Sequence, residues 1–255
     1  MAIRGKMGKD NAFNELWKPT PGQDASFGPV HLAGLPAIAR RYIGHAISPG
    51  TRIASAVRLH MHGDIRLKKK WYPFQADQVI RWESGFVWRA RVKMRGMPIT
   101  GYDRYIDGEG ELRWKLLGIF PIVNECGADV SRSAAERMLM EAVWLPSALL
   151  ATGVNWEEKS TGRLLVGTML RGQYENFELC LDGSGGIRSV SMLRWGNPEN
   201  RGYEAFPFGG MVEGESTFGG FTVPSKLRIG WYFGTGRFEP EGEFFRCIID
   251  EAVYH

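Results

Sequence analysis

The sequence predicts an α+β protein that is mostly β: a strongly curved antiparallel sheet, or half-barrel, of about ten strands with a helix packed on its concave face. Three observations support this fold class. Apolar and polar residues alternate over long stretches from residue 53 onward. One central segment has helical spacing instead. Strands and helices do not alternate along the chain, as they would in a parallel sheet.

The clearest predicted strand is FVWRARVKMR, residues 86–95. Apolar residues take every second position and basic residues the positions between them: Phe86, Trp88, Ala90, Val92 and Met94 alternate with Arg89, Arg91, Lys93 and Arg95. This period of two predicts one buried face and one basic face. The segments 53–67 and 72–80 repeat the pattern, and the second places Phe74 and Gln78 on the inner face.

The helix of the concave face is predicted over residues 133–151. Ser133 and Glu136 have the spacing of a capping box, and Pro146 is expected to kink or break the helix. A shorter helix is predicted over residues 35–47, where apolar residues recur at helical spacing before a Ser-Pro-Gly breaker.

The predicted domain organisation is simple. Residues 1–30 are polar and punctuated by proline and glycine, which predicts an arm or linker, and residues 31–255 are expected to form a single half-barrel domain. Hydrophobic residues make up 44% of the 255-residue chain, enough for a sizeable core that could enclose a cavity. The net charge of +4 by itself indicates no partner, and a nucleic acid is not favoured.

Cysteine usage and the first residues of the chain bear on location. Cys126, Cys180 and Cys247 are odd in number and form no C-x-x-C pair, which favours neither a disulfide framework nor a zinc site. The start MAIRGKMGKDNAFNELW has no apolar leader, and no run of about 18 apolar residues occurs. These features predict a cytoplasmic protein without a transmembrane segment; they leave the oligomeric state open.

The stretch GYDRYIDGEGELRWK, residues 101–115, concentrates four carboxylates around two glycines. We interpret it as a hairpin with the two-residue loop Gly108-Glu109, in which Asp103 pairs with Trp114. Asp103 and Asp107 then lie roughly 13 Å apart by strand rise, too far to share a cation. No metal site is expected here, and His60-x-His62 lacks an evident third ligand.

Asp103 is the main catalytic candidate, because it is expected to point inward among Tyr105 and Trp114. A carboxylate in apolar surroundings has a raised pKa, so it could act as a general acid or as a polar anchor for a ligand. The alternative is a buried aspartate that accepts hydrogen bonds from a helix terminus or an arginine. Glu141 is the second candidate: it either pairs with Arg137 on the helix surface or points into the sheet and forms a two-carboxylate site with Asp103.

Several motifs in combination resemble an uncharacterised bacterial family of unknown function, from about residue 35 to the C-terminus. They are LP…RRY (35–42), WYPFQADQ (71–78), GFVW (85–88), GYDRYIDGEGEL (101–112), ER…EAVWLP (136–146) and GGFTVP (219–224). The family carries no assigned activity. The order of elements is also remotely similar to the lipoprotein-carrier half-barrels, and this similarity implies a concave sheet that holds a lipid or an apolar molecule.

The function predicted from these features is binding of an apolar small molecule or lipid, without a cofactor, in a concave pocket lined by aromatic side chains. The expected ligand-binding residues are Trp88, Tyr105, Trp114, Gln78, Phe74 and Trp144. One alternative is a cofactor-independent isomerase, cyclase or dehydratase with Asp103 as acid/base. Another is a module that binds an anionic partner through the outer basic row of residues 89–95. The sequence does not decide whether the protein is an enzyme.

Overall fold

The computed structural model describes residues 9–19 and 25–255. The part of the predicted N-terminal arm that covers residues 1–8 and 20–24 lies outside the described residues. All strands in the described part belong to one antiparallel sheet, in the order β6-β5-β4-β3-β2-β1-β13-β12-β11-β10-β9-β8-β7. The strands are β1 (Ala56–Leu67), β2 (Lys70–Arg81), β3 (Gly85–Met94), β4 (Met97–Ile106), β5 (Glu109–Leu116), β6 (Phe120–Cys126), β7 (Asn155–Ser160), β8 (Arg163–Leu170), β9 (Gln173–Leu181), β10 (Ile187–Gly196), β11 (Glu204–Phe218), β12 (Phe221–Trp231) and β13 (Glu243–Tyr254).

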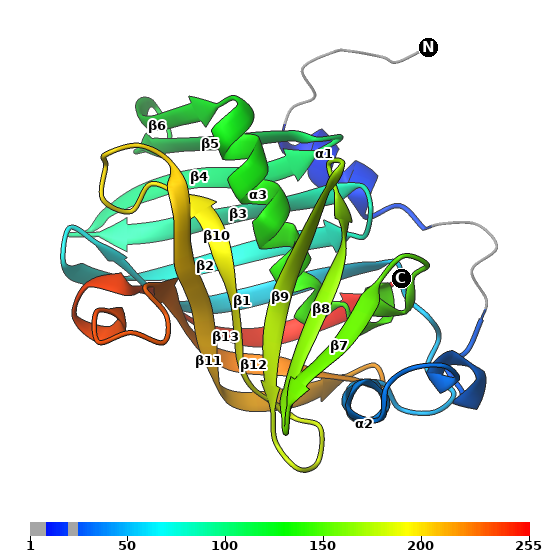
Figure 1. Ribbon diagram of the computed structural model, residues 1–255. Helices are drawn as coiled ribbons and strands as arrows, with labels where there is room; N and C mark the ends of the chain where they lie inside the picture. The colour runs from blue at the N-terminus through cyan, green and yellow to red at the C-terminus, as the bar shows by residue number, and fades with distance from the viewer. Residues whose placement is uncertain (1–8, 20–24) are drawn as a thin grey trace.

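The structure has fewer helices than strands, and these helices are short. They are α1 (Lys9–Leu16), α2 (Ala37–Ala46) and α3 (Ala128–Met140), with 3-10 segments at Pro29–Leu32, Glu141–Trp144 and Pro146–Leu150 and a π-helical turn at Phe238–Gly242. In Figure 1, α3 crosses the face of the sheet that points toward the viewer. It packs against β3 to β6 on one side and against β9 and β10 on the other, so the sheet curves around it.

This architecture confirms a mostly-β α+β fold with an open antiparallel sheet, but the number of strands was wrong. The sheet has 13 strands in the described residues, not about ten. The strands that the sequence pattern did not reveal are β6, β7 and β11. The first two are edge strands with mostly exposed side chains, and β11 is interrupted by Gly209, Gly210 and Gly214, so none shows a clean alternation.

The hairpin of β4 and β5 also differs from the prediction: its two-residue loop begins one residue earlier. Asp107 and Gly108 form the loop, with φ of +50° and +86°, so Ile106 rather than Asp107 is the last paired residue. This Asp-Gly loop suits a type I′ turn, in which both central residues have positive φ. The strand pairing therefore shifts by two residues, and Arg104 faces Glu111, with 2.7 Å between Nη2 and Oε2.

The central helix begins at Ala128, earlier than predicted, and its α-helical part ends at Met140. The predicted capping box of Ser133 and Glu136 is not formed, because both residues lie inside the helix. Glu136 is buried and accepts a hydrogen bond from Arg132 at 2.9 Å. The chain then continues as 3-10 turns toward the region of Pro146, where a break was expected.

A second, smaller core lies on the convex face, where α1 packs against β2 and β3. Its buried residues are Ala12, Phe13, Leu16, Val79 and Val87. Part of the outer basic row holds this helix: the Arg89 guanidinium lies 4.0 Å from the centre of the Phe13 ring. The proposed division at residue 30 stays a prediction, although this helix within the predicted arm has buried side chains.

Candidate functional site

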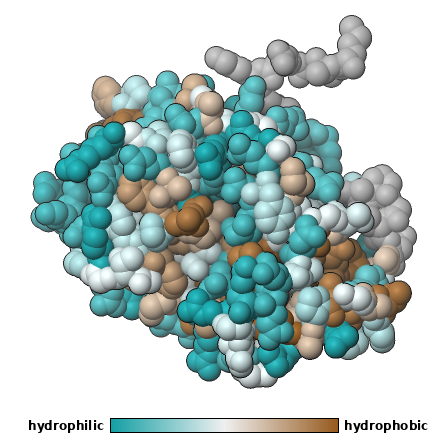
Figure 2. Space-filling view, viewed as in Figure 1, coloured by the Kyte–Doolittle hydropathy of each residue, from teal (hydrophilic) through white to brown (hydrophobic). Residues whose placement is uncertain are grey.

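A cavity of about 1020 Å³ lies on the concave face, between the sheet and α3. Apolar side chains from strands far apart in the sequence make up most of its wall. The aromatic ones include Phe86, Trp88, Trp114, Phe208, Trp231 and Phe245. Figure 2 shows hydrophobic residues near the centre of this side of the molecule, in the region of α3 and β10 in Figure 1. Because the sheet is curved, strands from both of its halves line this one apolar cavity.

The mouth of the cavity is formed by two connections. The end of β6 and the start of α3 (residues 122–129), together with residues 197–203 between β10 and β11, contribute lining residues that are exposed or half-buried. Polar groups gather here, and Trp195 donates its indole N–H to Asp129 at 2.9 Å beside the mouth. The interior is mostly apolar and the rim is polar, as in many small-molecule sites.

A chain of hydrogen-bonded charged groups lies in the cavity wall beneath α3. Arg137 of the helix donates to Asp103 of β4 at 3.1 Å and to Glu141 at 2.7 Å. Trp114 donates its indole N–H to the other oxygen of Asp103 at 2.9 Å, and the amide nitrogen of Gln78 donates to Glu141 at 2.6 Å. Both carboxylates therefore converge on one guanidinium, and each oxygen of the pair has a donor.

Burial and charge act in opposite directions on this cluster. Burial raises the pKa of Asp103, and the nearby Arg137 and the Trp114 hydrogen bond oppose this effect without cancelling it. Burial alone would lower the pKa of Arg137, but Glu141 and Asp103 outweigh it, so the pKa of this guanidinium is raised. The arginine is therefore a fixed cation that keeps two buried carboxylates in place.

Arg194 of β10 supplies a second guanidinium to the same cavity. It lies 4.5 Å from the ring centre of Phe208 and 5.3 Å from that of Trp231, and it donates to the Ser133 carbonyl oxygen at 3.2 Å. Burial, assisted by the positive charge of Arg137, lowers its pKa to about 10. Arg194 therefore joins the sheet to the backbone of α3 while it contributes positive charge to the cavity wall.

Two buried polar atoms on the cavity wall have no hydrogen-bond partner among the described residues. They are the indole nitrogen of Trp88 and the side-chain oxygen of Gln78, which belong to residues that are 3% and 1% exposed. Buried donors and acceptors are normally paired, because an unpaired one costs about 1–3 kcal/mol. One unpaired donor and one unpaired acceptor thus lie in a mostly apolar wall, in which the charged groups of Asp103, Arg137 and Glu141 are paired with one another.

Most of the residues singled out from the sequence meet at this cavity. Asp103, Glu141, Trp88, Trp114, Gln78 and Trp144 line it. Phe74 lies behind the wall and stacks on Phe245 at 4.8 Å. Tyr105 is buried opposite Phe86 and Gly110 and is not a lining residue. The roles of these residues in binding or catalysis stay predictions.

The predicted neighbours of Asp103 were wrong by two residues. Leu112, not Trp114, lies directly opposite it in β5, and Trp88 lies opposite it in β3. A shift of two residues keeps every side chain on its face, so Asp103 still points inward. Between the two interpretations of this residue, the geometry matches the buried aspartate held by an arginine.

The contribution of Arg194 was missed, although the sequence contained a signal for it. In IRSVSMLRW, the buried residues Val190 and Met192 are followed at the same period by Arg194. A charged residue at the end of an apolar row usually marks the end of the buried part of a strand, so the pattern alone does not place Arg194 in a cavity wall. Here the row continues into a cavity wall.

Near the middle of the sheet, several charged side chains of the outer face have partners of opposite charge. Arg89 pairs with Asp77 at 3.3 Å, and Arg104 pairs with Glu111. His60 and His62 lie within 3.0 Å of Asp77 and Asp250, respectively. Among residues 9–19 and 25–255, no three His, Cys, Asp or Glu side chains are grouped as metal ligands would be. In the same part of the chain, no helix is long and apolar enough to cross a membrane.

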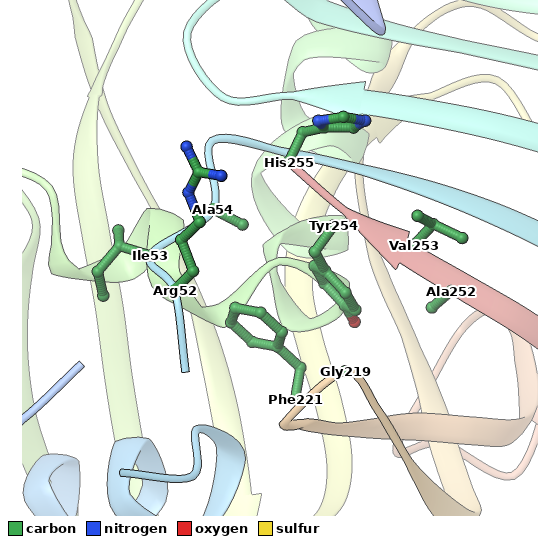
Figure 3. Close-up of a pocket in the computed structure, with 9 residues that line it drawn as sticks. All are labelled: Arg52, Ile53, Ala54, Gly219, Phe221, Ala252, Val253, Tyr254 and His255. Atoms are coloured by element: carbon green, nitrogen blue, oxygen red, sulfur yellow. The ribbon is translucent and has the colours of Figure 1, made fainter. Parts of the chain in front are cut away.

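A second hollow of about 250 Å³ lies near the C-terminus. Figure 3 shows Phe221 and Tyr254 side by side in it, and their ring centres are 4.1 Å apart in a stacked arrangement. Its other lining residues are Arg52, Ile53, Ala54, Gly219, Ala252, Val253 and His255. The hollow is a quarter of the size of the concave cavity and lacks its cluster of buried charges.

Similar solved structures include three bacterial proteins. A DUF1329 family protein from Desulfovibrio piger is 9% identical, with a TM-score of 0.42 over 85% of this chain and 90% of that chain. A domain assigned as an outer membrane lipoprotein-sorting protein from Vibrio parahaemolyticus is 8% identical, with a TM-score of 0.43 over 79% and 86%. A LolA superfamily protein from Nitrosomonas europaea is 6% identical, with a TM-score of 0.43 over 86% and 92%. At these values the likeness concerns the course of the fold alone.

The cytoplasmic location expected from the sequence is contradicted by these comparisons, since one similar structure is assigned to outer membrane lipoprotein sorting. The expectation depended partly on the cysteines. All three are free, but a thiol without a neighbouring thiol in the same chain forms no intramolecular disulfide in any compartment, so their state does not determine the location. The expected location is therefore withdrawn.

The resemblance noted in the sequence motifs is confirmed. No curated protein matches the chain. A family of unknown function, DUF6920, matches residues 33–254, which is most of the chain and includes the whole sheet and α3. The chain therefore belongs to the DUF6920 family.

Proposed function

We propose that the protein binds an apolar small molecule or a lipid in the concave cavity. The observation that carries this proposal is the cavity of about 1020 Å³ with walls formed mainly by apolar and aromatic side chains. Ligand pockets typically have volumes of about 300–1,000 Å³ and a few polar groups in an apolar wall. The concave cavity is at the upper end of that range, which suits a long or bulky ligand.

The expected driving force is removal of apolar ligand surface from water. Each buried methylene contributes about 0.8 kcal/mol, so roughly ten methylenes would contribute about 8 kcal/mol before the cost of association is subtracted. The wall already holds large rings at contact distance from one another: Trp88 and Trp114 have ring centres 5.6 Å apart. A ligand would therefore meet a surface that is largely formed in advance.

Unpaired polar atoms would orient the ligand. The Trp88 indole N–H can donate to a carbonyl or hydroxyl oxygen, and the Gln78 oxygen can accept from a hydroxyl or amide. Asp103 is less available, since Trp114 and Arg137 occupy both of its oxygens. Acid/base chemistry by Asp103 is therefore not part of this proposal. Neither is binding of an anionic partner by the middle of the outer face, where the arginines have acidic neighbours.

Binding can be tested with N-phenyl-1-naphthylamine, an uncharged apolar dye that fluoresces when it leaves water. We expect saturable binding near one dye per protein, and we expect the variant Ala134→Phe to weaken it at least tenfold. Ala134 is on the cavity side of α3, so a phenyl ring there would fill part of the hollow. Ala37→Phe, at an exposed position of α2, is the matched control and should leave binding unchanged.

Two outcomes would overturn the proposal: no saturable dye binding, or equal binding by the wild type and by a folded Ala134→Phe variant. Mass spectrometry of the protein after denaturing extraction provides an independent readout. An apolar compound that copurifies with the wild type and is lost from Ala134→Phe would identify the ligand class directly.

A further inference from the structure

Three hairpin turns lie side by side at one end of the sheet. They join β1 to β2, β3 to β4 and β5 to β6, and every second turn of successive antiparallel strands lies at the same end of the sheet. Figure 1 shows this end on the left, with the turns in cyan and green. The six strands span about 24 Å across the sheet at the usual spacing between neighbours. We call this area the hairpin-end surface, made of residues 67–70, 93–98 and 115–122.

The hairpin-end surface exposes large apolar side chains where β5 turns into β6. Leu117, Ile119, Phe120 and Ile122 are 46%, 71%, 59% and 49% exposed, and Met97 on the adjacent turn is 40% exposed. These five account for nearly half of the large apolar side chains that are exposed in the described residues. Apolar side chains grouped in this way usually mark a contact with a partner or a membrane.

Basic residues lie beside the apolar group on the same surface. They are Lys68, Lys69 and Lys70 on the first turn, Lys93 and Arg95 on the second, and Lys115 on the third, and all are exposed. None of them forms an ion pair within residues 9–19 and 25–255. The sequences IRLKKKWY, RVKMRGMPI and RWKLLGIFPIV, which run through the turns, contain no acidic residue. Glu239 and Glu243, which lie beyond β1, pair with Arg228.

The backbone of these turns adds a second unusual feature. Leu117 has a φ of +53°, and Lys68 and Lys69 have φ of +47° and +68°. Positive φ is unfavourable for bulky side chains, and glycine or asparagine would be easier to accommodate. Neither the local backbone nor burial explains a leucine at the tip, since half of its surface is exposed. Contact with an apolar environment outside the protein would explain it.

We propose that the hairpin-end surface docks on an anionic lipid membrane. The side chains of Ile119, Phe120 and Leu117 enter the boundary between head groups and acyl chains, while the neighbouring lysines and Arg95 contact lipid phosphates. An apolar tip beside a group of basic residues is a combination that binds such interfaces, because burial of apolar area and attraction to anionic lipid act together. A nucleic acid could bind the basic residues through its phosphates. The exposed aliphatic side chains would add little to its affinity, because its bases stack on aromatic rings.

The position of β6 relates this surface to the concave cavity. Ile122 is exposed on the hairpin-end surface, and both Ile122 and its neighbour Val123 contribute to the cavity lining. Docking would therefore bring the apolar wall of the cavity close to the lipid. Docking itself goes beyond the proposed binding function and does not depend on it.

Sedimentation with lipid vesicles tests the proposal. We expect the wild-type protein to bind phosphatidylglycerol vesicles at least tenfold more tightly than phosphatidylcholine vesicles, with affinity that falls as salt increases. Ile119→Ser/Phe120→Ser should weaken binding at least tenfold. The matched control is Met169→Ser/Leu193→Ser, at positions that are 62% and 66% exposed but lie on β8 and β10, which are far from β5 and β6 in the strand order.

The contribution of the basic residues is tested in the same assay. Lys69→Glu/Lys93→Glu/Arg95→Glu should remove most of the preference for phosphatidylglycerol, whereas Arg40→Glu/Arg41→Glu on α2 should not. All substituted positions are exposed, so the variants are expected to fold. Dye binding in the absence of vesicles should be unchanged in Ile119→Ser/Phe120→Ser, because neither residue lines the cavity. Failure of docking is thus distinguishable from failure of ligand binding.

The proposal is overturned if the wild type does not bind phosphatidylglycerol vesicles, or if the apolar variant binds them as well as the wild type does. It is also overturned if sedimentation velocity shows a dimer that Ile119→Ser/Phe120→Ser abolishes while vesicle binding is absent. In that case a second copy of the chain, not a membrane, covers the hairpin-end surface.

Discussion

Replacement of Arg137 by methionine removes the cation that two buried carboxylates share. The guanidinium lies 3.1 Å from Asp103 and 2.7 Å from Glu141, and the three side chains are 19%, 19% and 10% exposed, respectively. Methionine has a similar length and no charge, so the change leaves one oxygen of each carboxylate without a donor. Removal of one partner from a buried ion pair costs about 3–5 kcal/mol. Because water reaches part of this cluster, we expect the free energy of unfolding to fall by about 3 kcal/mol.

Urea unfolding followed by tryptophan fluorescence at pH 7 measures this loss. The m-value should stay near that of the wild type, so that the midpoint shift reports stability alone. The triple variant Asp103→Asn/Arg137→Met/Glu141→Gln is the control: it removes the uncompensated charges and should recover most of the stability. A loss below about 1 kcal/mol for Arg137→Met would refute the interpretation of the cluster as a buried ion network.

The pH dependence of the same variant provides a second test. Burial already raises the pKa of Asp103 with Arg137 present, and loss of the cation should raise it further. A carboxyl group with a raised pKa in the folded state stabilises the protein below its unfolded pKa, and this contribution is lost as pH rises through the folded pKa. The defect of Arg137→Met should therefore shrink as pH is lowered from 7 toward 4. A defect that grows over this range would contradict the argument.

Two further predictions concern close contacts elsewhere. A Cβ on Gly110 would lie 2.7 Å from the Ser131 Cα atom, so Gly110→Ala should destabilise the protein by about 1–3 kcal/mol in urea unfolding, and an unchanged midpoint would contradict this. Burial opposes the ionised form of Glu243, but hydrogen bonds from Arg228 and Arg246 outweigh burial and lower its pKa to about 2. The wild type should therefore lose roughly 2–3 kcal/mol as pH falls from 4.5 toward 2, and Glu243→Gln should lack this acid-dependent loss; equal losses in both proteins would exclude Glu243 as its source.

The sequence was sufficient to predict which side chains share a face. In β3 the strict alternation placed Trp88 inward, and the period of two did the same for Asp103 and Trp114 in the next hairpin. The loop was misplaced by one residue, which changed every partner across the hairpin. It changed no face, since the shift in pairing was two residues. Predictions about faces therefore held where predictions about neighbours did not.

The remaining features depend on contacts that no local pattern encodes. The glycines in β11 permit close approach of other groups: a Cβ on Gly209 would lie 2.7 Å from the Phe233 ring. Such a strand has too few side chains to show a period. Similarly, the cavity role of Arg194 depends on Ser133, 61 residues earlier in the chain. Sequence spacing alone does not provide the curvature that brings them together.

The two flanks of α3 are attached to the sheet by different kinds of contact. Toward β5, backbone lies against backbone at Gly110, and its N–H donates to the Ser131 hydroxyl at 2.8 Å. Toward β10, the helix is held through long side chains, with Arg194 bonded to Ser133. A bond made through a flexible arginine can lengthen or exchange for water, whereas a glycine contact has no such freedom. The cavity is therefore expected to widen on one side only, with α3 and β5 moving as a unit away from β10.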